Sequence, residues 1–224
     1  MDLGLMCANI AKLWTNYWHI YLIEGVLTTL KLTVFAVVLG ALLGVVVAML
    51  KMSKSKIIRF LITAYIEIIR GTPLLLQLML FYFVLPELIP IFDFSEFTWV
   101  AIALCINSSA YVSEIFRSGI QSVDKGQTEA ARSLGLSSRQ TMLRIVMPQA
   151  IKNILPALGN ELIMMLKETS LASTFFIGDL MTSHLIVKGA TFLMLESLII
   201  TGVIYFCMTY PLSKLVEAFE RKMK

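Results

Sequence analysis

Charged residues are scarce in this chain, and their scarcity is the first indication of its class. Only 15% of the 224 residues are Asp, Glu, Lys or Arg, whereas 58% are hydrophobic; soluble domains carry roughly 25% charged residues. The apolar residues gather in runs that approach the length of about 20 residues needed to cross a bilayer. The composition therefore excludes an ordinary soluble domain and predicts an all-α membrane protein built as one domain.

Several signatures of chemistry are also missing. The three cysteines, Cys7, Cys105 and Cys207, are odd in number and far apart, which indicates neither a disulfide framework nor a metal site. His19 and His184 are isolated from each other, so no paired-histidine metal motif is present. The chain has no nucleophile elbow and no glycine-rich phosphate loop. We expect no metal, no cofactor and no ATP hydrolysis by this chain alone.

Five apolar segments predict about five transmembrane helices. They are residues 25–50, 57–85, 99–116, 155–170 and 190–210. The second segment is interrupted by the sequence Arg70-Gly71-Thr72-Pro73. Proline lacks an N–H donor and its ring clashes with the preceding helical turn, so we expect a kink or break near Thr72.

The remaining segments divide the chain into a lead, a membrane domain and a tail. Residues 1–20 are expected to form an external amphipathic lead, because aromatic residues such as Trp14 and Trp18 suit a membrane interface rather than a signal peptide. Residues 21–215 are expected to form the membrane domain, and residues 216–224 a cytoplasmic tail.

The distribution of basic residues predicts how the chain is oriented. Most of the 19 Lys and Arg residues fall in three places: the link after the first span, the polar segment 117–151 and the C-terminal tail. With five spans these three places share one side, which the positive-inside rule makes cytoplasmic. The N-terminus and the acidic link 86–97 are then expected to lie outside.

The polar segment contains the most informative stretch, residues 129–148, which reads EAARSLGLSSRQTMLRIVMP. Asp124 followed by Gln127 fits a helix start, and Gly135 fits the residue just past the end of that helix.

A second helix is expected in the same stretch. Ser137 followed by Gln140 fits a second capping box. We expect this helix to end by Met147, because Pro148 disfavours helix at the residue before it. On shape alone the pair of helices is either a structural loop packed against its own bundle or a helix that seats in a partner's groove.

The spacing within this stretch resembles the EAA loop of ABC importer permeases. The matching positions are Glu129, Ala130, Ala131, Gly135, Ile145 and Pro148. Met147 stands where the family usually has Leu, which is a mild departure. Residues 69–74, 111–120 and 167–171 look like the polar amino acid uptake branch of that family, and the resemblance extends from about residue 20 to the end.

The resemblance implies a type I, binding-protein-dependent importer fold and a set of partners. In that family the loop forms a coupling helix that docks on a cytoplasmic ATP-binding subunit, so ATP and Mg²⁺ would be bound by that partner. An extracytoplasmic amino acid-binding protein and a second permease subunit, identical or similar, are implied as well. The expected setting is the lipid of a bacterial cytoplasmic membrane, with no nucleic acid partner.

Polar residues inside the spans give a candidate substrate site. Helical rise places Arg70, Asn107 and Glu161 at similar depths near the membrane midplane, where transporters commonly bind substrate. Arg70, or the helix restart at Thr72, would face a carboxylate, and Glu161 an ammonium or a cationic side chain. The candidate substrate-binding residues are Arg70, Thr72, Gln77, Asn107, Ser108, Glu161 and Glu168.

Structural roles compete with each of these assignments. Glu67 and Arg70 lie three residues apart and can neutralise each other, and Lys167 and Glu168 can form a structural lock. Residues 107–109 can act as hydrogen-bonding glue between helices.

A different function is the runner-up to the importer. A stand-alone, ion-coupled secondary transporter would use Glu161 or Glu168 as its coupling site. Such transporters often carry an inverted repeat, and none is evident in this sequence.

Overall fold

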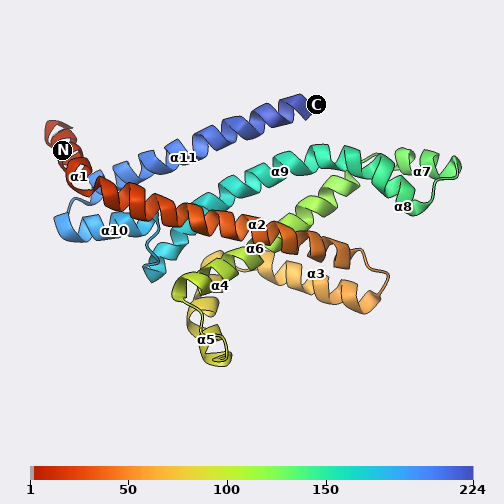
Figure 1. The fold of residues 1–224 in the computed structure, drawn as a ribbon, viewed down its shortest axis with the longest axis horizontal. Coiled ribbons are helices and arrows are strands. Elements are labelled where there is room, and N and C mark those ends of the chain that lie inside the picture. Colours follow the sequence, from red (N-terminus) through yellow and green to blue (C-terminus); the bar gives the residue numbers. More distant parts are fainter. Residues whose placement is uncertain (1–2, 224) are drawn as a thin grey trace.

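The computed structural model describes residues 3–223, and every regular element in that range is helical (Figure 1). Three π-helical turns, Ile20–Val26, Leu80–Val84 and Met142–Val146, and the 3₁₀ turn Thr169–Phe175 join some of the helices. The α-helices are α1 Leu3–His19, α2 Leu27–Lys51, α3 Lys56–Gly71, α4 Leu74–Met79, α5 Leu85–Leu88, α6 Glu96–Gln121, α7 Lys125–Ser133, α8 Ser138–Thr141, α9 Met147–Glu168, α10 Leu180–Thr191 and α11 Met194–Met223.

Within the described residues, three segments are long and apolar enough to cross a membrane by themselves: Leu3–Lys51, Glu96–Gln121 and Met194–Met223. Two bent pairs raise the number to five if each pair is one span: Lys56–Gly71 with Leu74–Leu88, bent by 106°, and Ser138–Phe175 with Leu180–Thr191, bent by 44°. The expected all-α membrane fold is confirmed, and the predicted five spans match the upper number.

The first span is longer than the apolar pattern indicates. The lead is predicted at residues 1–20, of which residues 1–2 lie outside the described residues. From Leu3 on it is helical and continues through a π-helical turn into α2, giving one helix of 49 residues. Gly25, where the sequence places the start of the span, does not break this helix. A Cβ at Gly25 would collide with Ser183 Oγ and Leu180 Cα of α10, so the glycine marks a close approach between helices.

The centre of the bundle is the contact between α2 and α6. Gly40 and Gly44 lie four residues apart on α2, and an added Cβ would come within 2.8 Å of Ser108 Cβ and 2.6 Å of Val112 Cβ, respectively. Small residues at this spacing let two helix backbones approach closely, as at many membrane helix interfaces. The packing of α2 therefore fixes the position of the Ser108 segment of α6.

The break predicted near Thr72 is confirmed. Helix α3 ends at Gly71, Thr72 and Pro73 adopt extended backbone, and α4 begins at Leu74. Pro73 cannot donate a backbone hydrogen bond, so the chain turns there rather than continuing straight.

Candidate functional site

A carboxylate and a hydroxyl meet where α6 crosses α9. Ser108 Oγ donates a hydrogen bond to Glu161 Oε1 at 3.0 Å. Ser108 is fully buried and Glu161 is half-buried. Helix α9 also continues to Glu168, seven residues or about two turns further along, which is half-buried as well. The structure thus joins two of the predicted site residues and places a third on the same helix.

Asn107, the neighbour of Ser108, belongs to a second network of hydrogen bonds, which spans the break between α3 and α4. Asn107 Nδ2 donates to Gln77 Oε1 at 2.9 Å. Gln77 Nε2 in turn lies 2.7 Å from the Ile69 carbonyl oxygen and 2.9 Å from Thr72 Oγ1. The structure therefore brings together Thr72, Gln77 and Asn107, three of the residues predicted for the substrate site.

The geometry of Gln77 also shows what this network does. A glutamine side chain offers two N–H donors and one carbonyl acceptor. In Gln77, which is buried, the nitrogen serves acceptors in α3 and at the break, and the oxygen accepts from α6. The amide is therefore committed to holding the two halves of the broken span against α6.

Arg70 lies in a different cluster from Glu161. Its guanidinium is 3.6 Å from Glu114 Oε2 and lies over the ring of Tyr111, 5.3 Å from the centroid. Glu114 also pairs with Lys51 at 2.6 Å and with Arg117 at 2.7 Å. The Glu114 carboxylate of α6 is thus paired with basic side chains from α2, from α3 and from its own helix.

Sequence reasoning did not select Glu114 as a site residue. It stands in the segment 111–120, which was noted only for its family resemblance. An acidic residue inside an apolar span, with Arg117 three positions on, was the available signal.

The polar segment contains the first predicted loop helix, α7. Asp124 caps its start by accepting from the Gly126 N–H at 2.7 Å. At its end, the Gly135 N–H bonds to the Arg132 carbonyl and the Leu136 N–H to the Ala131 carbonyl, both at 3.1 Å. This pair of bonds is a Schellman motif, and Gly135 has the left-handed backbone (φ +87°) that the motif requires.

The second loop helix begins as predicted but does not end as predicted. Ser137 and Gln140 form the reciprocal capping box. The expectation of a stop by Met147 is wrong, because the helix runs through the π-helical turn Met142–Val146 directly into α9. Pro148 follows this turn directly, and the wider π-helical geometry accommodates its ring and its missing N–H.

The outward surface of α7 is uncovered. Ala131 is buried against the rest of the loop, whereas Glu129, Ala130 and Gly135 are exposed. Leu134, the last residue before the turn, is 81% exposed. Of the other predicted loop residues, Ile145 is half-buried and Pro148 is exposed.

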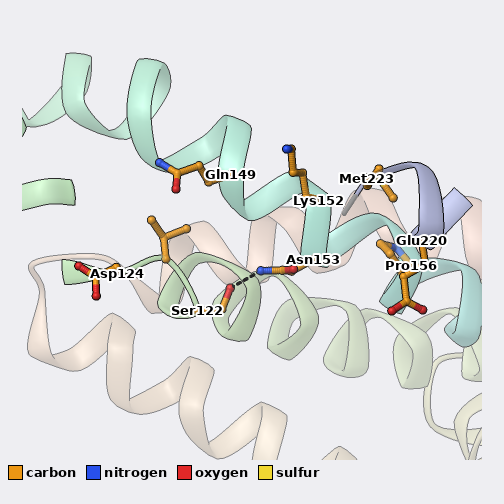
Figure 2. A pocket seen from close by; sticks show the side chains of 9 residues that line it. Ser122, Asp124, Gln149, Lys152, Asn153, Pro156, Glu220 and Met223 are labelled. Atoms are coloured by element: carbon orange, nitrogen blue, oxygen red, sulfur yellow. Dashed lines mark hydrogen bonds between the residues drawn. The ribbon is translucent and has the colours of Figure 1, made fainter. Parts of the chain in front are cut away.

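A cavity of about 480 Å³ lies at the loop end of the molecule, between the end of α6, α9 and the C-terminal end of α11. Asn153 donates a hydrogen bond to Ser122 at 2.7 Å across its wall (Figure 2). Its lining carries both charge signs, with Lys152 from α9 and Glu220 from α11. None of the predicted substrate residues lines it, so it is separate from the Ser108–Glu161 site.

Comparisons with known proteins find relatives over nearly the whole chain. The model of the family described as "Binding-protein-dependent transport system inner membrane component" matches residues 36–224. The chain is 42% identical over 204 residues to the arginine transport system permease protein ArtQ of Bacillus subtilis, covering 91% of this chain and 93% of that protein. It is also 42% identical over 228 residues to the nopaline transport system permease protein NocM of Agrobacterium fabrum, covering 98% of this chain and 91% of that protein.

Solved structures show the same fold. A chain from the structure titled "Crystal structure of an amino acid ABC transporter with histidines" matches with a TM-score of 0.88 and 48% identity, covering 93% of this chain and 96% of that one. A chain of the MetNI methionine ABC transporter matches with a TM-score of 0.69 and 16% identity, covering 89% of this chain and 96% of that one. The second likeness concerns the fold alone.

Proposed function

This chain belongs to the binding-protein-dependent transport system inner membrane component family, and from that premise we propose that it pairs with a second permease subunit to form the path for a polar amino acid. It is a multi-pass permease subunit of an ABC amino acid transport system, with the type I importer fold. The second subunit is either a copy of this chain or a similar permease. The membrane is the cytoplasmic membrane of a bacterium.

The observation that carries the coupling proposal is the exposed, rigidly capped helix α7. Both of its ends are fixed by hydrogen bonds, and its outward residues Ala130 and Leu134 are uncovered. A short preformed helix with a small apolar face suits a groove on a partner protein. The partner we propose is a cytoplasmic ATP-binding subunit, which would bind ATP and Mg²⁺ in place of this chain.

This role sets the orientation of the chain. The loop, the basic link between α2 and α3 and the C-terminal end of α11 would be cytoplasmic, in keeping with the positive-inside rule. The N-terminus and the link between α5 and α6 would face an extracytoplasmic amino acid-binding protein. Closure of two ATP-binding subunits would draw the two α7 helices together and switch the path between outward- and inward-facing states.

The cargo we propose is an amino acid with a cationic or amide side chain. Relatives of the chain are named for the transport of arginine, glutamine and nopaline. Glu161 is a half-buried carboxylate whose Oε1 accepts from Ser108. A carboxylate in such a setting forms strong, charge-assisted hydrogen bonds with an ammonium or guanidinium.

Co-purification tests the proposed docking of α7. We expect an ATP-binding subunit, co-expressed with the tagged permease, to be retained by the wild type and lost with Leu134→Asp. Ile91→Asp is the matched control, because Ile91 is an equally exposed apolar residue (83%) in the link between α5 and α6. Retention of the ATP-binding subunit by Leu134→Asp, or equal loss in both variants, would contradict docking through α7.

A further inference from the structure

A second cavity, of about 810 Å³, opens inside the loop itself. It lies between the end of α6 and the helices α7 and α8. Apolar side chains, among them Ile120 and Val146, line its inner part, and Val146 is buried. Exposed polar side chains, among them Lys125, Arg132 and Ser138, also line it. The cavity therefore combines an apolar floor with a polar rim.

The rim is cationic. Both charged side chains that line the cavity, Lys125 and Arg132, are positive. Arg132 Nη1 donates to the Leu136 carbonyl at 2.6 Å, which holds the guanidinium in place and leaves its other N–H groups available. A fixed guanidinium, an ammonium and a hydroxyl that line one cavity are a favourable set of groups for a phosphate.

Thr141 adds an independent observation. Its side chain lines the same cavity and is 2% exposed, yet its hydroxyl has no hydrogen-bond partner among the described residues. Buried hydroxyl groups in proteins are nearly always partnered. The loop thus has an unpaired polar atom, on a residue that lines the cavity wall.

The cavity lies at the end of the molecule that faces the cytoplasm in the orientation proposed above. Figure 1 shows α7 and α8 at the same end as the link between α2 and α3. That link carries Lys54, and Lys56 is the first residue of α3. Ile120 is in the last turn of α6, one of the membrane spans. With α6 as a membrane span, the cavity mouth at its cytoplasmic end is expected near the lipid headgroups.

We propose that this cavity binds an anionic phospholipid of the cytoplasmic leaflet, with its phosphate between Lys125 and Arg132 and the start of an acyl chain on the apolar floor. Basic pockets on the cytoplasmic side of membrane proteins suit such headgroups. The inference rests on the proposed orientation, and it links the lipid to the loop that would dock the ATP-binding subunit.

Binding of phosphatidylglycerol to the detergent-purified permease, followed by native mass spectrometry, tests the proposal. We expect the double variant Lys125→Gln, Arg132→Gln to weaken binding about 25-fold, because each basic residue near an anionic lipid contributes roughly fivefold. The double variant Arg139→Gln, Arg144→Gln is the matched control, since it removes the same charge from exposed positions of the same loop that do not line the cavity. The control is expected to change the binding affinity by less than about twofold.

Further arms distinguish the sources of phosphate. Phosphatidylcholine is expected to bind about tenfold more weakly than phosphatidylglycerol, and soluble glycerol phosphate to compete only at far higher concentration. The single variant Arg132→Lys, which keeps the charge, is expected to retain most of the affinity for phosphatidylglycerol.

Three results would overturn the proposal. Equal loss in the control pair would show a general effect of surface charge. Competition by glycerol phosphate at the concentration of the lipid would show a site for a free phosphate anion. Unchanged lipid binding in the Lys125, Arg132 pair would show that the lipid binds elsewhere on the permease. The readout uses neither transport nor ATP hydrolysis, so its failure leaves the proposed function standing.

Discussion

Ser108 donates a hydrogen bond to Glu161 across the contact of α6 and α9, with 3.0 Å between the oxygens. On its other side Ser108 lies against Gly40 of α2, where an added Cβ would come within 2.8 Å of the serine Cβ. The carboxylate that we assign to the substrate is therefore positioned by a hydroxyl that a third helix holds in place. Changes at each of these positions have different and measurable consequences.

Glu161→Gln tests the assignment of the substrate carboxylate. Glutamine keeps the size of the side chain and still accepts a hydrogen bond from Ser108, but it removes the charge. We expect affinity for cationic amino acids to fall about tenfold or more, because hydrogen bonds to a charged group contribute roughly 1.5–3 kcal/mol. Calorimetric binding of an amino acid panel to the purified complex measures this, with the exposed Glu87→Gln as control. Unchanged affinity for every amino acid would remove Glu161 from the site.

Gln77→Leu tests the network at the helix break. Leucine leaves the Ile69 carbonyl and the Asn107 amide without the partner that Gln77 supplies. An unsatisfied buried polar group costs about 1–3 kcal/mol, so we expect a clear fall in the thermal unfolding midpoint. Gln149→Leu is the control, because Gln149 is exposed and bonds to a single carbonyl within its own helix. Equal stability of the two variants would show that the Gln77 network does not hold the break together.

Gly40→Ala tests the close contact of α2 and α6. The added methyl group meets the Ser108 side chain, and overpacking of this kind costs about 1–3 kcal/mol. We expect lower thermal stability and, because Ser108 shifts, weaker amino acid binding. Gly202→Ala provides the contrast, since a Cβ there meets open space and alanine favours helix by up to about 1 kcal/mol. A Gly40 variant as stable as the Gly202 variant would contradict the packing.

Gly135→Val tests the turn that ends the coupling helix. The backbone at Gly135 has φ +87°, where a β-branched residue is strained by roughly 1–2 kcal/mol. We expect the loop to rearrange, so that ATP hydrolysis by the partner is no longer coupled to transport. Gly135→Asn, which tolerates left-handed backbone better, should keep more of the coupling. Normal coupled transport by Gly135→Val would show that the turn is not required.

The loop was the most predictable part of the molecule, and the reasons are local. The capping residues Asp124 and Ser137 and the turn residue Gly135 act within a few positions of their own sequence, so the pattern alone located both helix starts and the turn. Pro148 misled the prediction because its effect depends on the preceding turn. A π-helical turn at Met142–Val146 accommodates it, and no residue pattern marks that turn.

The interior was less predictable because its partners come from distant segments. Depth along each helix brought Ser108 and Glu161 to the same level, and they do meet. Depth says nothing about the direction of a side chain, and Arg70 is turned toward Glu114 and Tyr111. The Gln77 network likewise depends on how far the span bends at Thr72, which is a property of the packed bundle.

Uptake by reconstituted vesicles tests the central claim, that this chain is a translocation subunit driven by a separate ATPase. The permease is measured alone and together with its ATP-binding subunit and binding protein, with labelled arginine or glutamine outside and ATP inside. The account predicts no accumulation by the permease alone, with or without an ion gradient, and ATP-dependent accumulation by the complete assembly. Accumulation by the permease alone, driven by an ion gradient, would contradict the account and establish a secondary transporter.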